Sequence, residues 1–264
     1  MKYVGNVLYV GLAILVIVVA AATYYSGKLD APPAPVPPIE APAEPQVDLG
    51  PRHPMPEPLA DNEGPRSLVP LPALDDSDAF FLLDIDSTFG SAIEALLVRE
   101  AVIDRLVTTV DNLSRGKLAE NIRPVGRLDE TFTTDAGDDG NIVLGISSYA
   151  RYDALIAQLY YADLDSVYDT YQRFYPLFQK SYERLGYPNA YFNDRLVEVI
   201  DHLIAAPTPD GPIVLARPNV LYEFADPDLE ALSSGQKLML RMGPNNSGTT
   251  KRILEKFRDQ LTND

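Results

Sequence analysis

An uninterrupted apolar run at the N-terminus is the feature that most constrains this chain. No charged side chain occurs between Lys2 and Lys28. A helix needs about 20 apolar residues to cross the hydrocarbon core of a bilayer, and residues 3–25 supply that length. Tyrosines stand at both ends of the run, where amphipathic rings prefer the headgroup level. We therefore expect residues 1–28 to form a transmembrane anchor that contacts the lipid bilayer through residues 3–25.

A cleaved signal peptide is the alternative, because Ala20, Ala21 and Ala22 provide small residues at the right spacing. The apolar stretch is, however, longer than the usual signal core of about 7–15 residues. Lys2 and the terminal amine give the N-terminal side a weak positive bias. We expect a single-pass inner-membrane protein with a cytoplasmic N-terminus and a periplasmic C-terminal domain.

A proline-rich segment follows the anchor. Between residues 31 and 72, 14 of the 42 residues are proline. Each proline fixes φ and removes a backbone donor, so both helix and sheet are disfavoured. We expect residues 29–72 to be an extended, acidic linker of polyproline type, with a reach on the order of 100 Å. A proline-rich ligand for a groove-type reader is the alternative.

Composition excludes several classes of function. The chain has no cysteine, which removes disulfides, thiolate nucleophiles and Cys-ligated zinc. Its net charge is −16, and residues 73–264 contain 31 acidic and 18 basic side chains. Such a field repels phosphate backbones, so we expect no nucleic-acid partner. With two histidines in the chain and no Gly-rich phosphate loop, we expect no metal and no cofactor.

Residues 73–264 show mainly helical periodicity, so the predicted fold is mainly α: one helical domain with one small β-hairpin. Apolar residues recur at helical spacing over 75–98, 102–113 and 148–159. A longer stripe, rich in tyrosine, runs from Tyr161 to Leu185 and should be buried, with a bend at Pro176. The remaining predicted helices cover the stretches around 193–204, 227–232, 234–242 and 253–261.

Local signals place the hairpin and the helix starts. Residues 132–134 and 142–144 flank a loop rich in aspartate and glycine, which predicts a β-hairpin rather than a calcium loop. Asn193 is expected to cap the N-terminus of its helix. Asp226 followed by proline predicts another helix start, and Ser233 with Gln236 predicts a capping box.

Short catalytic patterns occur without their partners. The apolar run ending in Asp84 and Asp86 matches the first motif of haloacid-dehalogenase-type phosphatases, but the alternating strands that this chemistry needs are not predicted. Ser234 with Lys237 fits the Ser-x-x-Lys pattern of penicillin-binding enzymes without its companion motifs. His202 is expected on a solvated helix face. No catalytic residue is predicted.

Several longer motifs occur through the helical region: Ser148–Asp153, Tyr175–Phe178, Gly186–Arg195, Tyr222–Pro227 and Lys237–Pro244. Together they resemble an uncharacterised proteobacterial family, the domain of unknown function 3014, over roughly Leu74 to Leu261. The resemblance brings no established activity; it implies an anchor, a spacer and a soluble domain.

These observations predict a non-enzymatic envelope protein whose domain binds or scaffolds a protein or peptidoglycan partner. The alternatives are an envelope hydrolase that uses carboxylates unpaired in the sequence, and a purely structural spacer. Candidate ligand or partner contacts are Asn193, Asp194, Arg195 and Arg241. Arg241 lies inside an apolar run and therefore needs a partner, either a ligand or a carboxylate.

Overall fold

The computed structural model describes residues 50–56, 69–116, 122–125, 132–161, 163–218 and 221–262 of the 264-residue chain. The predicted anchor and most of the predicted linker lie outside these ranges. None of the helices described within them combines the length and the apolar character that a membrane crossing requires.

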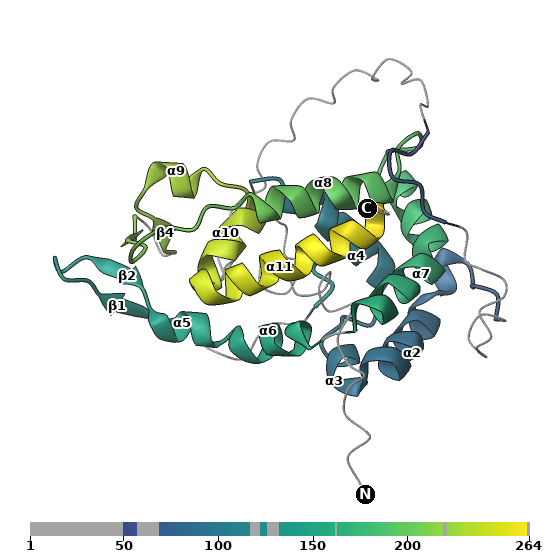
Figure 1. The fold of residues 1–264 in the computed structure, drawn as a ribbon, viewed down its shortest axis with the longest axis horizontal. Helices are drawn as coiled ribbons and strands as arrows, with labels where there is room; N and C mark the ends of the chain where they lie inside the picture. Colours follow the sequence, from purple (N-terminus) through teal and green to yellow (C-terminus); the bar gives the residue numbers. More distant parts are fainter. Residues whose placement is uncertain are drawn as a thin grey trace, which may run out of the picture.

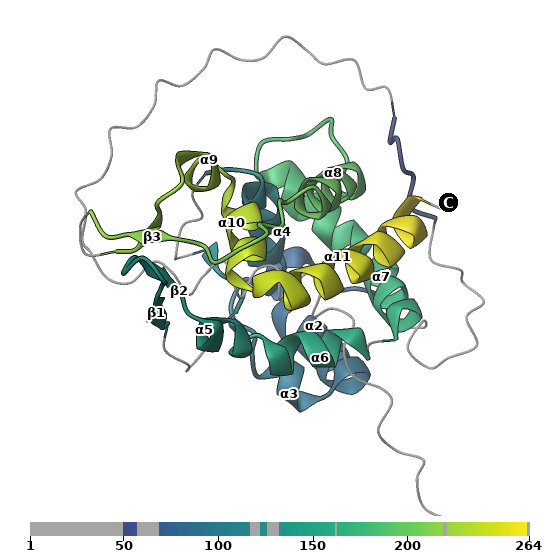
Figure 2. The same ribbon diagram turned by 60° about the vertical axis from the view of Figure 1, so that its left-hand side comes forward.

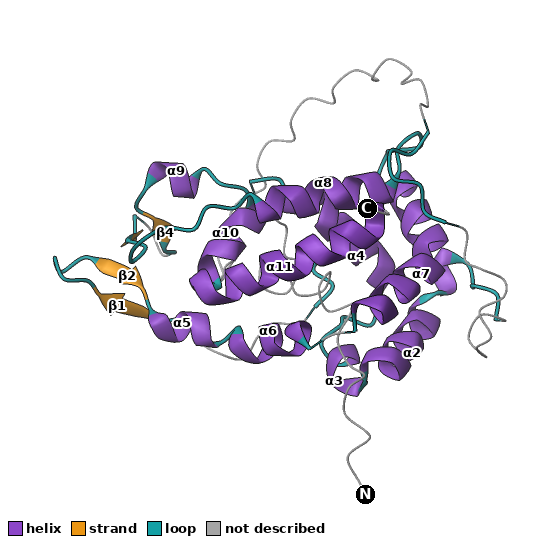
Figure 3. Ribbon diagram, in the orientation of Figure 1, coloured by secondary structure: helices purple, strands orange, loops and turns teal. Residues whose placement is uncertain are grey.

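Helices dominate the described part of the chain, so the prediction of a mainly α fold is confirmed (Figures 1 and 3). In chain order the elements are a 3-10 helix, η1 (Leu74–Asp76), then α2 (Asp78–Phe89), α3 (Ser91–Glu94), α4 (Val102–Leu113), β1 (Thr134–Ala136), β2 (Ile142–Leu144), α5 (Ile146–Ala150), α6 (Asp153–Tyr160), α7 (Leu164–Arg184), α8 (Phe192–Ile204), β3 (Leu215–Ala216), β4 (Glu223–Phe224), α9 (Pro227–Glu230), α10 (Ser234–Arg241) and α11 (Gly243–Thr262).

The main core forms where α4, α7, α8 and α11 pack together. Helix α4 contacts α7, α8 and α10, while α11 lies along α8 and α6 (Figure 1). Aromatic rings from three helices meet in this core: Phe81 contacts Phe174 edge-on at 4.8 Å between centroids, and Phe178 stacks with Phe192 at 5.9 Å. Burying such large side chains provides much of the driving force for folding.

The tyrosine-rich stripe forms the buried face of α7, as its periodicity predicts. Tyr171 and Tyr182 are buried in it, but Tyr161 lies before the helix begins and is 74% exposed. The helix continues through Pro176 as one element rather than splitting there. Gly186, at φ +108°, follows its C-terminus, where a left-handed residue commonly ends a helix.

The predicted hairpin is confirmed, with β1 and β2 antiparallel and Asp135 opposite Val143. The structure adds a second antiparallel pair, β3 with β4, so the expectation of one hairpin was incomplete. A bridge between Val143 and Val214 joins the two pairs. These strands gather at one end of the molecule (Figure 3). A second, smaller apolar cluster lies among them. That cluster consists of Leu144, Ile213, Leu215, Phe224 and Leu240.

Two helix starts depend on different kinds of cap. Asp226 accepts a hydrogen bond from the Asp228 N–H, which confirms the predicted local cap of α9. Helix α4 is capped from another helix instead: Asp78 accepts the N–H groups of Ala101 and Val102 at 2.7 and 2.9 Å. This cap supports the left-handed conformation of Ala101, at φ +51°.

The predicted capping box at α10 is half formed. Ser233 Oγ accepts the N–H of Gln236 at 3.1 Å, but the Gln236 side chain donates to the His202 carbonyl instead of returning to Ser233. Helix α11 then begins at Gly243, where φ is +78°. A Cβ at this position would lie 2.6 Å from the Tyr149 ring, so both the conformation and the packing require glycine.

Candidate functional site

Asn193, a predicted contact residue, is fully buried and joins three separate parts of the chain. Its amide nitrogen donates to the carbonyls of His53 at 2.8 Å and Leu261 at 3.2 Å, and its amide oxygen accepts from the Tyr171 hydroxyl at 3.2 Å. Burial raises the pKa of Tyr171 well above its ordinary value, so the phenol remains a donor. Asn193 therefore holds the linker, α7 and the C-terminal end of α11 on α8.

The predicted role of Asn193 as a helix cap was wrong. Helix α8 begins at Phe192, and its flanking residue Tyr191 makes no side-chain cap. The Phe192 N–H is bound instead by the side-chain oxygen of Gln179, on α7, at 2.8 Å. Since the cap comes from a neighbouring helix, the amide of Asn193 is available for contacts at longer range.

Asp194 binds the backbone of the predicted linker. Its two carboxylate oxygens accept the consecutive N–H groups of Arg52 and His53 at 2.9 and 2.8 Å. Because Asp194 lies in the first turn of α8, the helix dipole favours its negative charge. Its contacts with backbone N–H groups do not depend on the side chains of the bound segment.

Together these contacts fix residues 50–56, which we call the docking segment, against α7 and α8. Met55 packs against the main core, and the Pro56 carbonyl accepts from Gln172 on α7 at 3.1 Å. The linker predicted over 29–72 thus contains a stretch that belongs structurally to the domain. Sequence reasoning missed it, because Met55 is one of several isolated apolar residues among the prolines and no periodicity marks it.

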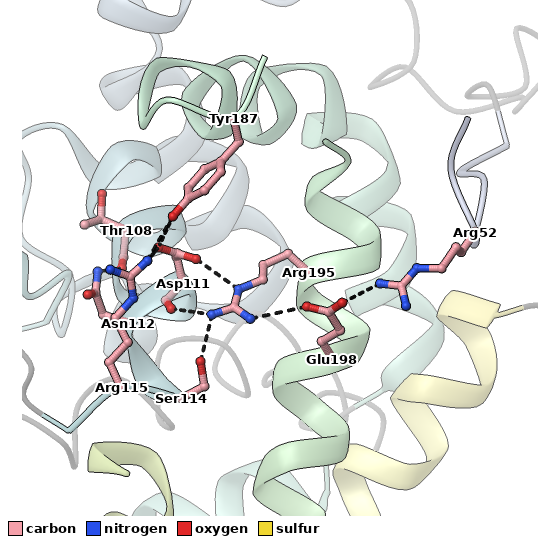
Figure 4. Close-up of polar contacts among 9 residues, drawn as sticks. All are labelled: Arg52, Thr108, Asp111, Asn112, Ser114, Arg115, Tyr187, Arg195 and Glu198. Carbon is pink, nitrogen blue, oxygen red and sulfur yellow. Dashed lines mark hydrogen bonds and ion pairs between the residues drawn. The ribbon is translucent and has the colours of Figure 1, made fainter. Parts of the chain in front are cut away.

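Arg195 lies at the centre of a chain of alternating charges (Figure 4). Its guanidinium Nε binds Asp111 Oδ1 at 2.9 Å, and Nη2 donates to the Asp111 carbonyl and to Ser114 Oγ, both at 2.7 Å. On its other side, Asp111 also binds Arg115, whose side chain is 52% exposed, at 2.7 Å. The chain continues outward through Glu198, which contacts Arg195 at 3.3 Å and Arg52 at 2.5 Å.

Exposure rises steadily from Asp111 outward to Arg52. The side chain of Asp111 is 6% exposed, that of Arg195 20%, that of Glu198 46% and that of Arg52 61%. An exposed ion pair contributes little to stability, whereas removing one partner of a buried pair is costly. The inner contact between Asp111 and Arg195 therefore joins α4 to α8, while the outer contact with Arg52 adds an electrostatic contact for the docking segment.

Arg241 lies away from the other three predicted residues, on α10. Its guanidinium carbon stands 5.3 Å from the centre of the Phe224 ring, a cation–π contact beside the smaller apolar cluster. The four residues proposed from the sequence thus divide into a group of three on α8, which binds the docking segment and α4, and one residue near the strands.

His202 is half-buried, so its predicted place on a solvated helix face was wrong. Its Nε2 lies 2.8 Å from Ser233 Oγ, at the junction of α8 and α10. The helical pattern of α8 alone did not reveal that α10 begins there. Desolvation, and to a lesser extent the positive charge of Arg195, lower the pKa of His202 below its ordinary value of 6.5.

Because the pKa of His202 is lowered in the folded chain, this residue makes the domain less stable as the pH falls. Near and below pH 6.5 the unfolded chain binds more protons at this residue than the folded chain, so the free energy of unfolding falls as the pH is lowered. We expect His202→Gln, whose amide can also bond Ser233, to lose less stability than the wild type between neutral and mildly acid pH. Urea unfolding at a series of pH values measures the difference; equal slopes for the two proteins would contradict the assignment.

The buried carboxylates of the described residues are engaged in structural contacts. Asp84 and Asp86 lie within helix α2 rather than at a strand end, and Asp84 forms an ion pair with Arg173 at 2.5 Å. Asp111 and Asp194 make the contacts given above. Among the residues that the structure describes, no group of three or more His, Asp or Glu side chains is placed to hold a metal ion.

A cleft of about 720 Å³ opens at the end of the molecule that carries the strands. It is bounded by the hairpin, the loop 207–213 and the junction of α10 with α11. Figures 1 and 2 both place the docking segment at the opposite end, beside the C-terminus of α11. The domain therefore has its linker contact and its cleft on opposite sides of the helical core.

A family model described as "Protein of unknown function (DUF3014)" matches residues 102–258. The match runs from the first residue of α4 into the last turns of α11, and so includes Asn193, Asp194, Arg195 and Arg241. No curated protein and no solved structure matches the chain.

Proposed function

Because the chain belongs to this DUF3014 family of unknown function, we propose a role from its structure and sequence: a membrane-anchored, non-enzymatic binding module of the cell envelope. The observation that carries the proposal is the position of the cleft. The hairpin that bounds it lies at the end of the domain opposite the docking segment (Figure 1). A module held by its linker at one end presents a cleft at the other end to partners away from the membrane.

The docking segment affects the length of the tether between the membrane and the domain. If the linker moved freely up to residue 72, it would reach on the order of 100 Å at about 3.1 Å per residue. Because residues 50–56 are held on α7 and α8, the predicted tether would end at residue 49, and an extended stretch as long as residues 31–49 would reach about 60 Å at the same rise. The docking segment thus shortens the tether and fixes the direction from which it enters the domain.

The orientation in the membrane is part of the same proposal. The weak positive bias at Lys2, with Lys28 offset by Asp30 on the other side of the apolar run, supports a cytoplasmic N-terminus and a periplasmic domain. The buried carboxylates Asp84, Asp111 and Asp194 are engaged in structural contacts, which supports a structural rather than a catalytic role for these three residues.

Site-specific photo-crosslinking in intact cells tests the binding role. A photoreactive residue replaces Ile146, which lines the cleft and is 77% exposed, and in a matched control it replaces Leu83, which is 66% exposed on α2. We expect a discrete adduct in the membrane fraction from position 146 and none from position 83. Adducts of the same pattern from both positions, or none from either, would contradict the role of the cleft.

A periplasm-specific reporter fused after Asp264 tests the orientation in the same cells. The proposal expects an active reporter in the membrane fraction. A silent reporter on a full-length, membrane-bound chain would overturn the periplasmic assignment.

A further inference from the structure

The cleft has an apolar interior formed by β2, the end of the loop 207–213 and α10. Val143 and Ile213 line it from the strand side, and Met239 and Leu240 line it from the helix. Its volume, about 720 Å³, falls within the range of cavities that enclose a ligand or a few side chains. Such an interior favours an occupant with apolar groups.

The charges at the cleft have a single sign. Asp135, Asp138 and Asp210 are exposed and line it, and the lining residues include no Lys, Arg or His. Asp135 also accepts the Ile146 N–H at 3.0 Å, which leaves its charge in place. Lys251 is not among the lining residues, and its ammonium donates to the carbonyl of Ala206. The rim therefore favours a cationic group.

Ser247, on α11, supports a ligand site independently of the acidic rim. It lines the cleft and is 4% exposed, and its hydroxyl has no hydrogen-bond partner among the described residues. A buried hydroxyl without a partner destabilises a folded protein, because the bond that it made to water in the unfolded chain is lost. A ligand group that bonds Ser247 would remove this cost.

The edge of the hairpin indicates the form of the occupant. Strand β1 contributes Asp135 and Ala136 to the cleft, and among the described strands it pairs with β2 alone. The other edge of β1 can therefore offer backbone N–H and C=O groups to an extended chain. An extended peptide would reach this edge, the apolar interior and the acidic rim together.

We propose that the cleft binds an extended, basic peptide segment of a partner protein, with apolar side chains inside and Lys or Arg side chains at Asp138 and Asp210. This inference rests on the proposed function, since it names the partner chemistry of the same cleft. The acidic rim selects for cationic side chains, and Ser247 provides a hydrogen-bonding group in the interior.

Fluorescence anisotropy of the full-length protein in detergent tests the proposal. The probes are three labelled peptides that alternate valine with lysine, glutamine or glutamate. We expect the lysine peptide to bind most tightly and the glutamate peptide to show no binding. Asp138→Asn combined with Asp210→Asn should weaken binding of the lysine peptide by about tenfold, from the loss of two exposed ion pairs. The matched control, Asp76→Asn with Asp86→Asn, changes the net charge equally on exposed residues outside the cleft and should leave the affinity unchanged.

Ser247→Ala tests the role of the serine in the cleft, because two quantities, the melting temperature and the affinity for the peptide, should change in opposite senses. We expect this variant to raise the melting temperature by about 2–4 °C, because a buried unpaired hydroxyl is removed, while it weakens binding of the lysine peptide. A lower melting temperature with unchanged binding would overturn the role of Ser247 in the cleft.

The outcomes separate this inference from the proposed function. If all three peptides bind equally well, the cleft does not select basic segments and the inference is overturned. If Ala136→Trp, which fills the exposed edge of the cleft, then abolishes this binding, the cleft is still a binding site and the proposed function is supported. No binding of any peptide at millimolar concentration would overturn the inference, and the crosslinking from position 146 would then decide the proposed function by itself.

Discussion

Replacing Asn193 by alanine is expected to destabilise the domain by about 3–5 kcal/mol, because the change leaves several buried polar groups without partners. The Tyr171 hydroxyl loses its acceptor, and the carbonyls of His53 and Leu261 lose a donor. Tyr171 cannot compensate by turning to solvent, since it lies within the main core. Chemical unfolding of the full-length protein in detergent measures the change in the free energy of unfolding.

Asn245→Ala is the matched control for Asn193→Ala. Asn245 lies in the first turn of α11 and is exposed, so its replacement should change the stability by no more than about 0.5 kcal/mol. The docking segment supplies a second readout. Trypsin should cleave after Arg52 faster in Asn193→Ala than in the wild type, because two of the contacts of His53 depend on α8. Cleavage at the wild-type rate, together with unchanged stability, would show that Asn193 does not hold the segment.

Replacing Arg195 by methionine is expected to cost about 2–4 kcal/mol, because it leaves Asp111 buried with a reduced set of partners. Arg195 contacts Asp111 through Nε and donates to its carbonyl through Nη2. Methionine keeps much of the apolar length of the arginine side chain, so the loss reports the guanidinium rather than the packing. The same unfolding measurement gives the magnitude.

A double-mutant cycle with Asp111→Asn isolates the interaction between the two side chains. We expect the double variant to be more stable than the sum of the single changes predicts, by at least about 1 kcal/mol. Arg52→Met, at the exposed end of the same chain of charges, is the matched control and should cost less than about 1 kcal/mol. The prediction depends on the greater burial of Arg195 than of Arg52. It would be contradicted if the stability losses of Arg195→Met and Asp111→Asn simply added in the double variant, or if Arg52→Met and Arg195→Met lost the same stability.

Much of the secondary structure could be predicted because its causes are local. The apolar spacing of Val102 to Leu113 predicted α4, and the structure has the helix at those bounds. The turn residues between Ala136 and Ile142 predicted the hairpin, and the Asp226-Pro227 pair predicted the start of α9. In each case, the residues that determine the element lie within it or next to it.

The candidate site shows where sequence reasoning could identify residues but not their partners. The prediction that Asn193, Asp194 and Arg195 make important contacts stays a prediction as regards a ligand or partner. Within the chain they bind the docking segment and α4, at separations of about 80 to more than 140 residues. Periodicity carries no information about such distant pairs, because it describes which face of a helix is buried and not what covers it.

The sequence by itself determined the mainly α character of the domain, the bounds of several elements and the acidic charge, since these follow from local spacing and composition. The tertiary structure alone decided which helix caps another, as Asp78 does for α4 and Gln179 for α8. It also decided that residues 50–56 of the predicted linker dock on α8, and that a cleft with an acidic rim forms between the hairpin, the loop 207–213 and α11. These features arise where segments distant in sequence meet, and the energy of their contacts depends on burial that only the folded chain creates.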